Sequence, residues 1–150
     1  MSEHLNIAVD IGNGASKWAT PIGWGLIPSY LQFLDSWECK DILVDDSTRM
    51  VRYITGSNKS LEGKAWVIGE YAKVLGQPLY QKEKHLHSLE MVLGLIEPPK
   101  HQCDIVIDCL PYSVPDDLRN EETAIIYNSI QGEHEVEINK KRATITIKKV

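Results

Sequence analysis

An aspartate and a lysine flank a short glycine turn near the start of the chain, in the segment DIGNGASK at residues 10–17. A tight turn between two strands exposes successive backbone N–H groups, which together attract an anion. Gly12 and Gly14 allow positive φ and let a phosphate approach without a Cβ in its way. Lys17 can reach back across the hairpin and place its charge on a phosphate oxygen. The spacing therefore predicts a phosphate-binding turn, although the same residues also suit a hairpin that binds nothing.

The carboxylate of Asp10 needs a separate explanation, because it would repel a bare phosphate at this turn. A hydrated Mg²⁺ between the two groups removes the conflict, since Mg²⁺ keeps several of its waters and takes few protein carboxylates. We therefore expect a magnesium ion that Asp10 holds through water.

Strands are expected on both sides of the turn, because short apolar and β-branched runs flank it at residues 5–10 and 16–20. Residues 23–34 are apolar and aromatic, and they suit a third strand or an irregular connection. Residues 50–55 and 65–68 read as a strand and its return, joined by the turn-rich sequence GSNKSLEG. The first half of the chain is therefore predicted to consist mostly of strands.

The second half predicts helices on either side of a buried strand. Residues 84–97 favour a helix that ends before Pro98, and residues 104–110 favour a strand buried on both faces. A second helix is expected from the Pro-Asp-Asp sequence at residues 115–117 to Gly132, and a hairpin around Asn139-Lys140 follows it. The residues expected on the buried side of the two helices are Leu86, Leu89, Leu93 and Ile96 in the first, and Leu118, Ile125, Ile126 and Ile130 in the second.

Composition excludes several classes of function. The chain has 150 residues and a net charge of -5, which argues against nonspecific binding to nucleic acid through a basic surface. Its three cysteines and the lack of a signal peptide or a long apolar segment favour a soluble, cytoplasmic protein without disulfides. Cys103 and Cys109 suit small core positions, and the spacings His85-x-His87 and His101-x-Cys103 are poor metal sites. Residues 133–137, with three glutamates and His134, read as a solvated strand face.

Several segments resemble known proteins in the right order along nearly the whole chain. The pattern Asp10-x-Gly12-x-Gly14-x-x-Lys17 resembles the first phosphate motif of the actin, chaperone and sugar-kinase superfamily. Other segments resemble the bacterial actin-like ATPases of the ParM/StbA type in particular. These are IPS at 27–29 with Phe33, AWVIGEYA at 65–72, DIVIDCLP at 104–111 and the hairpin at 133–150.

This resemblance implies an α/β fold of the ribonuclease-H-like, actin type, with the chain as the N-terminal half of a two-domain protein. A β-rich insertion is expected at about residues 35–70, and the C-terminal nucleotide-binding half is expected to be absent. The resemblance also implies ATP or GTP with Mg²⁺, bound through the backbone of Gly12, Asn13 and Gly14 and the side chain of Lys17 at the β/γ-phosphates, and through Asp10 at the metal. Asn13 departs from the Ser or Thr that is frequent there, but its amide can still donate to a phosphate.

The family forms filaments that segregate plasmid DNA, which implies contacts with further copies or with a full-length homologue, and an adaptor that binds the DNA. Its other nucleotide motifs would lie beyond Val150, so we expect no useful nucleotide hydrolysis by this chain alone. Two alternatives stay open at the level of sequence. One is a protein-interaction domain that binds no nucleotide and acts as a decoy or cap on actin-like filaments. The other is a fragment of the type III pantothenate kinase kind, whose D-x-G-N start the residues at 10–13 also resemble.

Overall fold

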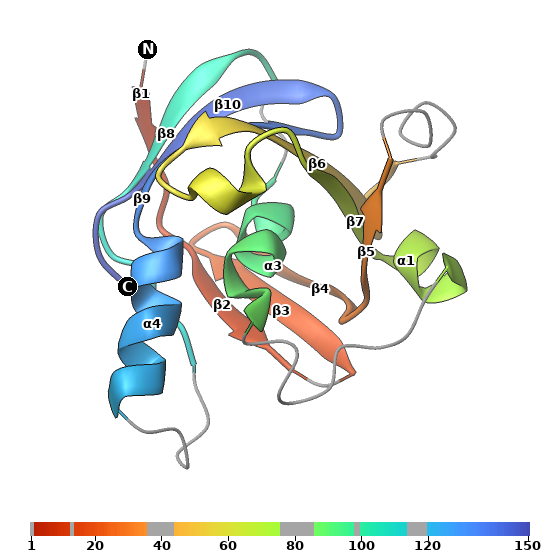
Figure 1. Cartoon of the computed structure of the whole chain (residues 1–150), viewed down its shortest axis with the longest axis horizontal. Coiled ribbons are helices and arrows are strands. Elements are labelled where there is room, and N and C mark those ends of the chain that lie inside the picture. Colours follow the sequence, from red (N-terminus) through yellow and green to blue (C-terminus); the bar gives the residue numbers. More distant parts are fainter. Residues whose placement is uncertain (1, 13, 36–43, 76–85, 98–99, 114–119) are drawn as a thin grey trace.

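Two β-sheets and the helices between and around them form the described part of the chain (Figure 1). The computed structural model describes residues 2–12, 14–35, 44–75, 86–97, 100–113 and 120–150. The predictions for Asn13, His85, Leu118 and the helix start at 115–117 therefore lie outside the described residues. The mixed α/β fold expected from the sequence is confirmed.

The smaller sheet is an antiparallel meander of three strands, β2 (Ala8–Ile11), β3 (Ala15–Thr20) and β4 (Gly23–Pro28). It contains the predicted glycine hairpin, with the turn between β2 and β3. The apolar region at 23–34 contains two strands instead of one. After Pro28 the chain leaves the small sheet, and β5 (Leu31–Leu34) belongs to the larger one.

The larger sheet has seven strands in the order β1-β8-β10-β9-β6-β7-β5. Its strand β8 lies parallel to both β1 and β10, while the other neighbours are antiparallel. The predicted strands at 50–55 and 65–68 and the C-terminal hairpin are confirmed. The bounds are β1 (Ser2–His4), β6 (Thr48–Gly56), β7 (Ala65–Gly69), β8 (Cys103–Ile107), β9 (Gly132–Ile138) and β10 (Lys141–Ile147).

The N-terminal segment connects the two sheets. The backbone amide of Leu5 donates to Val106 at 2.9 Å, and that of Val9 donates to Pro111 at 3.2 Å. The predicted strand at 5–10 is only partly correct, because β2 begins at Ala8, residues 5–7 are not a strand, and β1 lies before the predicted segment. Both β1 and β2 run beside β8 and the residues after it. The expectation that residues 104–110 form a strand buried on both faces is wrong, because burial alternates along β8. One face of this strand, with Asp104 and Val106, is exposed or half-buried.

Helix α3 (Ser88–Leu95) lies between the two sheets and contacts β6 and β7 of one and β2 and β3 of the other (Figure 1). All eight of its residues are buried, so the predicted single apolar stripe is too narrow. Leu86, which the sequence places on that stripe, is 78% exposed because it precedes α3. A helix packed on several sides needs apolar residues around its whole circumference.

Two further helices lie at the periphery, α1 (Glu70–Leu75) and α4 (Asn120–Ile130), and a short 3₁₀ helix, η2 (Lys59–Leu61), follows β6. Ile126 and Ile130 of α4 are buried as predicted, whereas Ile125 is 69% exposed. Successive helical residues are turned by about 100°, so neighbours cannot both face the core. None of the described helices is long and apolar enough to cross a membrane.

Two other sequence interpretations need correction. His134 does not belong to a solvated face: its side chain is fully buried in β9, where it contacts Tyr53 and the end of α4. Cys109 is exposed, because it lies beyond the end of β8, whereas Cys103 is partly buried and packs against the core. His134 was not recognisable as buried from the sequence, since the alternation of a strand sets which side is buried only after its partners are known.

Candidate phosphate-binding site

Asp10 and Lys17 lie directly opposite each other across the β2–β3 hairpin. Paired residues of neighbouring antiparallel strands point to the same face of the sheet, so the two side chains share one face. Both are exposed. Among the described residues no ion pair within 4.0 Å uses either charge, so both stay available to an outside ligand.

Gly12 is required for a steric reason and not for the positive φ expected from the sequence. Its φ is not in the left-handed region, and a Cβ built on it would lie 2.5 Å from the carbonyl oxygen of Ala15. Its N–H donates to that same oxygen at 3.1 Å, which closes the hairpin. The amide of Gly12 is therefore occupied within the turn. A Cβ on Gly14, by contrast, would meet no described atom within 4 Å, so this side of the turn is open.

The peptide group between Gly14 and Ala15 is oriented by the strands on both sides of β3. The carbonyl of Gly14 accepts the N–H of Ser29 at 3.1 Å. Within one trans peptide group the C=O and N–H point in opposite directions, so the Ala15 N–H is directed away from Ser29, toward the Gly12 side of the hairpin. The carbonyl of Ala15 accepts the Gly12 N–H on that same side.

Two buried serines lie behind the turn. The hydroxyl of Ser29 donates to the carbonyl of Gly12 at 2.6 Å and lies 2.7 Å from the hydroxyl of Ser16. Both side chains are fully buried. The sequence offered one signal, the IPS segment at 27–29, but no role for its serine followed from the resemblance alone.

Tyr112 lies beside β2, close to Asp10. It pairs with Val9 in a parallel bridge, and its hydroxyl donates to the Ser88 hydroxyl at 2.9 Å. The pKa of Tyr112 is raised to about 12, mainly by burial and with a smaller contribution from the negative charge of Asp10. Tyr112 is therefore a neutral group at ordinary pH and adds no charge to the site.

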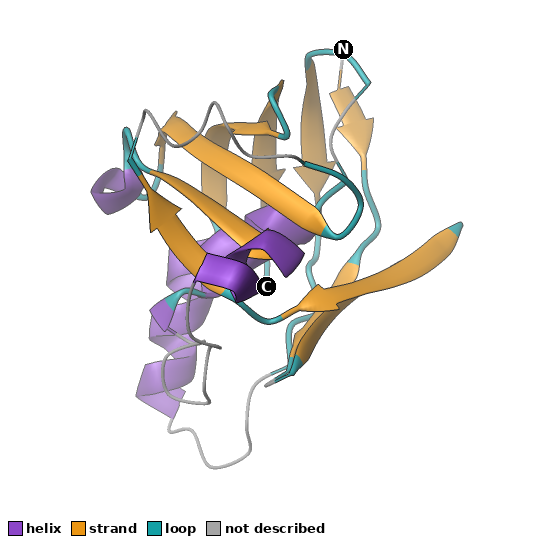
Figure 2. Cartoon of the chain, turned by 90° about the vertical axis from the view of Figure 1, so that its right-hand side faces the viewer, coloured by secondary structure: helices purple, strands orange, loops and turns teal. Residues whose placement is uncertain are grey.

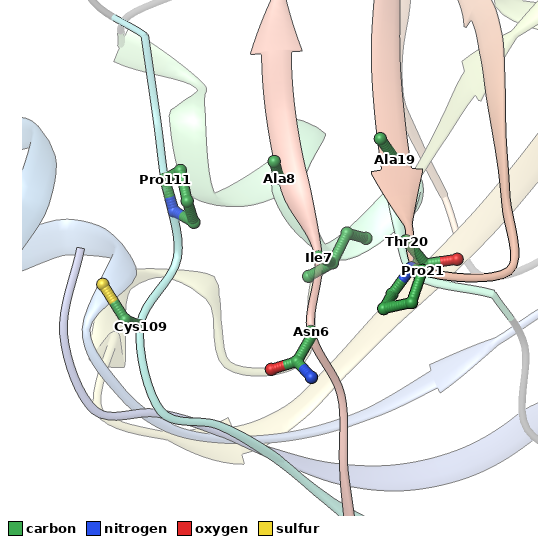
Figure 3. A pocket seen from close by; sticks show the side chains of 8 residues that line it. All are labelled: Asn6, Ile7, Ala8, Ala19, Thr20, Pro21, Cys109 and Pro111. Carbon is green, nitrogen blue, oxygen red and sulfur yellow. The ribbon is translucent and has the colours of Figure 1, made fainter.

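A hollow of about 350 Å³ lies at the opposite end of the hairpin from the glycine turn (Figure 3). It contains none of the residues that the sequence assigned to phosphate or magnesium. Its lining comes from the start of β2, the end of β3 and the segment after β8, namely Asn6, Ile7, Ala8, Ala19, Thr20, Pro21, Cys109 and Pro111. The candidate site is therefore the exposed turn and not this hollow.

The described residues contain no group of three or more His, Cys, Asp or Glu side chains that could hold a metal ion. Asp10 is thus a single carboxylate at the turn. One carboxylate suits a metal whose other positions are filled by water and phosphate, which is how Mg²⁺ usually binds. The arrangement can supply one cation and one carboxylate beside an open glycine turn.

Comparisons with known proteins bear on the fold. No family model matches the sequence, and a search of curated proteins finds no relative. Among solved structures, the actin-like protein Alp7A matches 99% of this chain and 44% of its own, with a TM-score of 0.65 at 14% identity. The ParM of Bacillus thuringiensis with AMPPNP matches 97% and 44%, with a TM-score of 0.62 at 21% identity. The apo pSK41 ParM protein matches 97% and 48%, with a TM-score of 0.61 at 17% identity.

An AlfA filament bound to AMPPNP shares the fold more distantly, with a TM-score of 0.52 at 17% identity over 97% of this chain and 52% of its own. These neighbours favour the actin-like resemblance over the pantothenate kinase one. The chain spans about half the length of the structures that it matches. Over that length, it has the fold of the actin-like proteins.

Proposed function

We propose that this chain is the phosphate-binding N-terminal domain of an actin-like, nucleotide-dependent ATPase that forms filaments in plasmid segregation. The observation that carries the proposal is the pairing of Asp10 with Lys17 across an open glycine hairpin, within a fold shared with actin-like proteins. Some of these neighbours have been solved with ATP, AMPPNP or ADP, which supports a nucleotide as the ligand.

In this proposal the β/γ-phosphates of ATP or GTP lie against the open side of the turn. Lys17 neutralises phosphate charge, and the amides of Asn13 and Gly14 are the proposed donors, while Gly12 keeps the turn closed. Asp10 holds water on a Mg²⁺ ion that accompanies the nucleotide. The ion would supply positive charge to the phosphate oxygens, and Asp10 is exposed and unpaired among the described residues, as that role requires.

The domain arrangement is part of the same proposal. Residues 1–150 correspond to one domain with a β-rich insertion at about 35–70, and a second domain would complete the nucleotide site. Further copies, or a full-length homologue, are the proposed partners, supported by the neighbour that was solved as a filament. A DNA-binding adaptor would link such filaments to their cargo.

A titration of the chain with AMPPNP and Mg²⁺, followed by calorimetry or NMR shifts, tests the ligand. Lys17→Ala is expected to weaken binding at least about tenfold, because a charge-assisted contact to phosphate contributes on the order of 1.5–3 kcal/mol. Asp10→Asn is expected to reduce the difference between titrations with and without Mg²⁺. Lys141→Ala removes an exposed lysine at the far hairpin and is the matched control. Equal binding by Lys17→Ala and Lys141→Ala would contradict the proposal.

An interaction domain without nucleotide is the second candidate, and one observation favours it. Trp24 and Leu26 of β4 are 71% and 50% exposed, and their register places them on the same sheet face as Lys17. Apolar side chains gathered on one face frequently mark protein contacts. This candidate predicts that Trp24→Ser/Leu26→Ser abolishes co-sedimentation with filaments of an actin-like homologue while AMPPNP has no effect on it.

A further inference from the structure

We propose that Ser29, supported by Ser16, is the positioning residue that shapes the glycine turn for phosphate. This inference rests on the proposed function, and it concerns a residue that contacts no ligand itself. Ser29 is the first residue after β4, where the chain passes from the small sheet to the large one. It reaches the turn through both its side chain and its backbone.

The direction of each hydrogen bond follows from counting protons. A serine hydroxyl has one proton, and that of Ser29 goes to the Gly12 carbonyl, which can only accept, at 2.6 Å. The 2.7 Å contact between the two serines must then be donated by Ser16. Ser16 therefore holds the Ser29 hydroxyl in the orientation that reaches Gly12. Because both side chains are fully buried, water does not compete for these bonds.

The effect on the turn is to fix the carbonyls of both glycines. The Ser29 side chain holds that of Gly12, and the Ser29 N–H holds that of Gly14 at 3.1 Å. Both carbonyl oxygens, which would repel an anion, are thereby engaged by Ser29. A turn that is ordered before the anion arrives saves the cost of ordering it during binding. Ser29 thus shapes the turn without touching the phosphate.

The same residue connects the turn to the large sheet. The carbonyl of the next residue, Tyr30, accepts the N–H of Gly69 at 3.2 Å, and β5 then pairs with β7. A displacement of the turn can therefore be transmitted to β7 and the start of α1 through the adjacent residues Ser29 and Tyr30. The alternative is that Ser29 only fills space between the sheets, in which case its hydroxyl would matter for stability and not for binding.

Amide hydrogen exchange of the chain without ligand tests the first half of this inference. The probe is the Gly12 N–H, which is bonded to Ala15 and needs the turn to stay closed. We expect Ser29→Ala, and to a smaller extent Ser16→Ala, to speed its exchange about five- to tenfold relative to amides in β9, since one hydrogen bond is lost. Ser60→Ala, at an exposed serine on η2, is the control. Unchanged exchange at Gly12 in a folded Ser29→Ala protein would overturn the inference.

Titration of the same variants with AMPPNP and Mg²⁺ tests the second half. We expect affinity to fall about five- to tenfold for Ser29→Ala and less for Ser16→Ala, which keeps the bond between Ser29 and Gly12. Faster exchange with wild-type affinity would show a merely structural serine and overturn the positioning role. If the unaltered chain binds no AMPPNP, the proposed function fails, while Gly12 exchange still decides whether Ser29 sets the turn. If Ser29→Ala does not fold, Gly12 exchange and the AMPPNP titration of Ser16→Ala test the inference in its place.

Discussion

The two glycines of the turn differ in what an added side chain would meet. A methyl group on Gly12 would collide with the carbonyl oxygen of Ala15 at 2.5 Å, whereas one on Gly14 would meet no described atom within 4 Å. The backbone oxygen cannot move aside as the end of a flexible side chain can. The same substitution therefore has different consequences at the two positions, and it separates folding of the turn from binding at it.

We expect Gly12→Ala to lower the free energy of unfolding by about 1–3 kcal/mol, because the hairpin must open to relieve the clash. Gly14→Ala is expected to change the free energy of unfolding by less than about 1 kcal/mol, yet to weaken binding of AMPPNP with Mg²⁺, since its methyl occupies the side from which phosphate approaches. Urea denaturation and the titration give the two quantities. A Gly14→Ala protein with wild-type affinity would place the phosphate elsewhere.

His134 is a buried histidine whose two ring nitrogens are both satisfied in its neutral form. Nε2 lies 2.8 Å from the carbonyl of Ile130 and must donate to it, so Nδ1 accepts the proton of the Tyr53 hydroxyl at 2.7 Å. Burial lowers the pKa of His134 below its ordinary value of 6.5. The same Tyr53 hydroxyl accepts the N–H of Asn58 at 3.1 Å, so three segments meet at this pair.

A lowered pKa in the folded state makes stability depend on pH in a defined direction. Below the ordinary pKa the unfolded chain binds a proton at His134 that the folded chain refuses, so the free energy of unfolding falls as pH drops from about 7 to 5. We expect His134→Gln, which cannot gain a proton, to show a flatter pH profile in this range. Urea denaturation at several pH values measures both proteins. Parallel profiles would show that His134 does not titrate differently on folding.

At the scale of elements, helix α3 and strand β7 pack so closely that one glycine is required between them. A Cβ on Gly94 would lie 2.2 Å from Cδ1 and 2.8 Å from Cγ1 of Ile68. We expect Gly94→Ala to lower the free energy of unfolding by about 1–2 kcal/mol, despite the better helix propensity of alanine. Ile68→Val lacks Cδ1, so the double variant should recover part of that loss. Strictly additive effects in the double variant would place the strain elsewhere.

The hairpin between β9 and β10 makes its turn with two residues in the left-handed region. The φ values of Asn139 and Lys140 are 49° and 68°, the combination typical of a two-residue type I′ turn. Asn139 also accepts the N–H of Met50 through its side chain at 2.8 Å. The two positions therefore share a backbone conformation but not a contact.

Glycine tolerates this conformation without strain, so Lys140→Gly is expected to raise the free energy of unfolding by about 0.5–1 kcal/mol. Asn139→Gly relieves the same backbone but leaves the Met50 amide without its acceptor, and it should be destabilising by about 1 kcal/mol. Thermal or urea denaturation of the two variants measures the contrast. A gain in stability from both substitutions would show that the Asn139 side chain contributes nothing.

Elements with a simple period could be predicted from the sequence, and those set by tertiary contacts could not. The alternation around Asn139-Lys140 defined the C-terminal hairpin, and the glycine segment at 10–17 defined the first one. For helix α3 the sequence predicts only an amphipathic helix, because nothing local indicates that two sheets enclose it. Ser29 lies 17 residues from Gly12, so its contact with the turn depends on how β4 returns, which no local pattern contains.

At the scale of the whole molecule, the chain forms two sheets with helices packed among them (Figure 2). The sheets are joined by α3, which contacts both, and by the N-terminal segment, which runs beside β8 in space. The candidate turn lies at the end of the small sheet, on its exposed side. A nucleotide there would contact the described residues from one direction only. The chain matches about half the length of its actin-like neighbours, in which the fold continues.

Phosphoryl transfer needs charge and orientation from several sides of the transferred group, and there is little covalent chemistry that a single pair of residues can perform. At the turn, the described residues offer one cation and one carboxylate. We therefore expect the purified chain to bind AMPPNP with Mg²⁺ yet to release phosphate from ATP no faster than its Asp10→Asn/Lys17→Ala variant. A phosphate-release assay and the titration on the same preparation measure turnover and occupancy together. Release clearly above that of the double variant would mean that these 150 residues form a complete catalytic site.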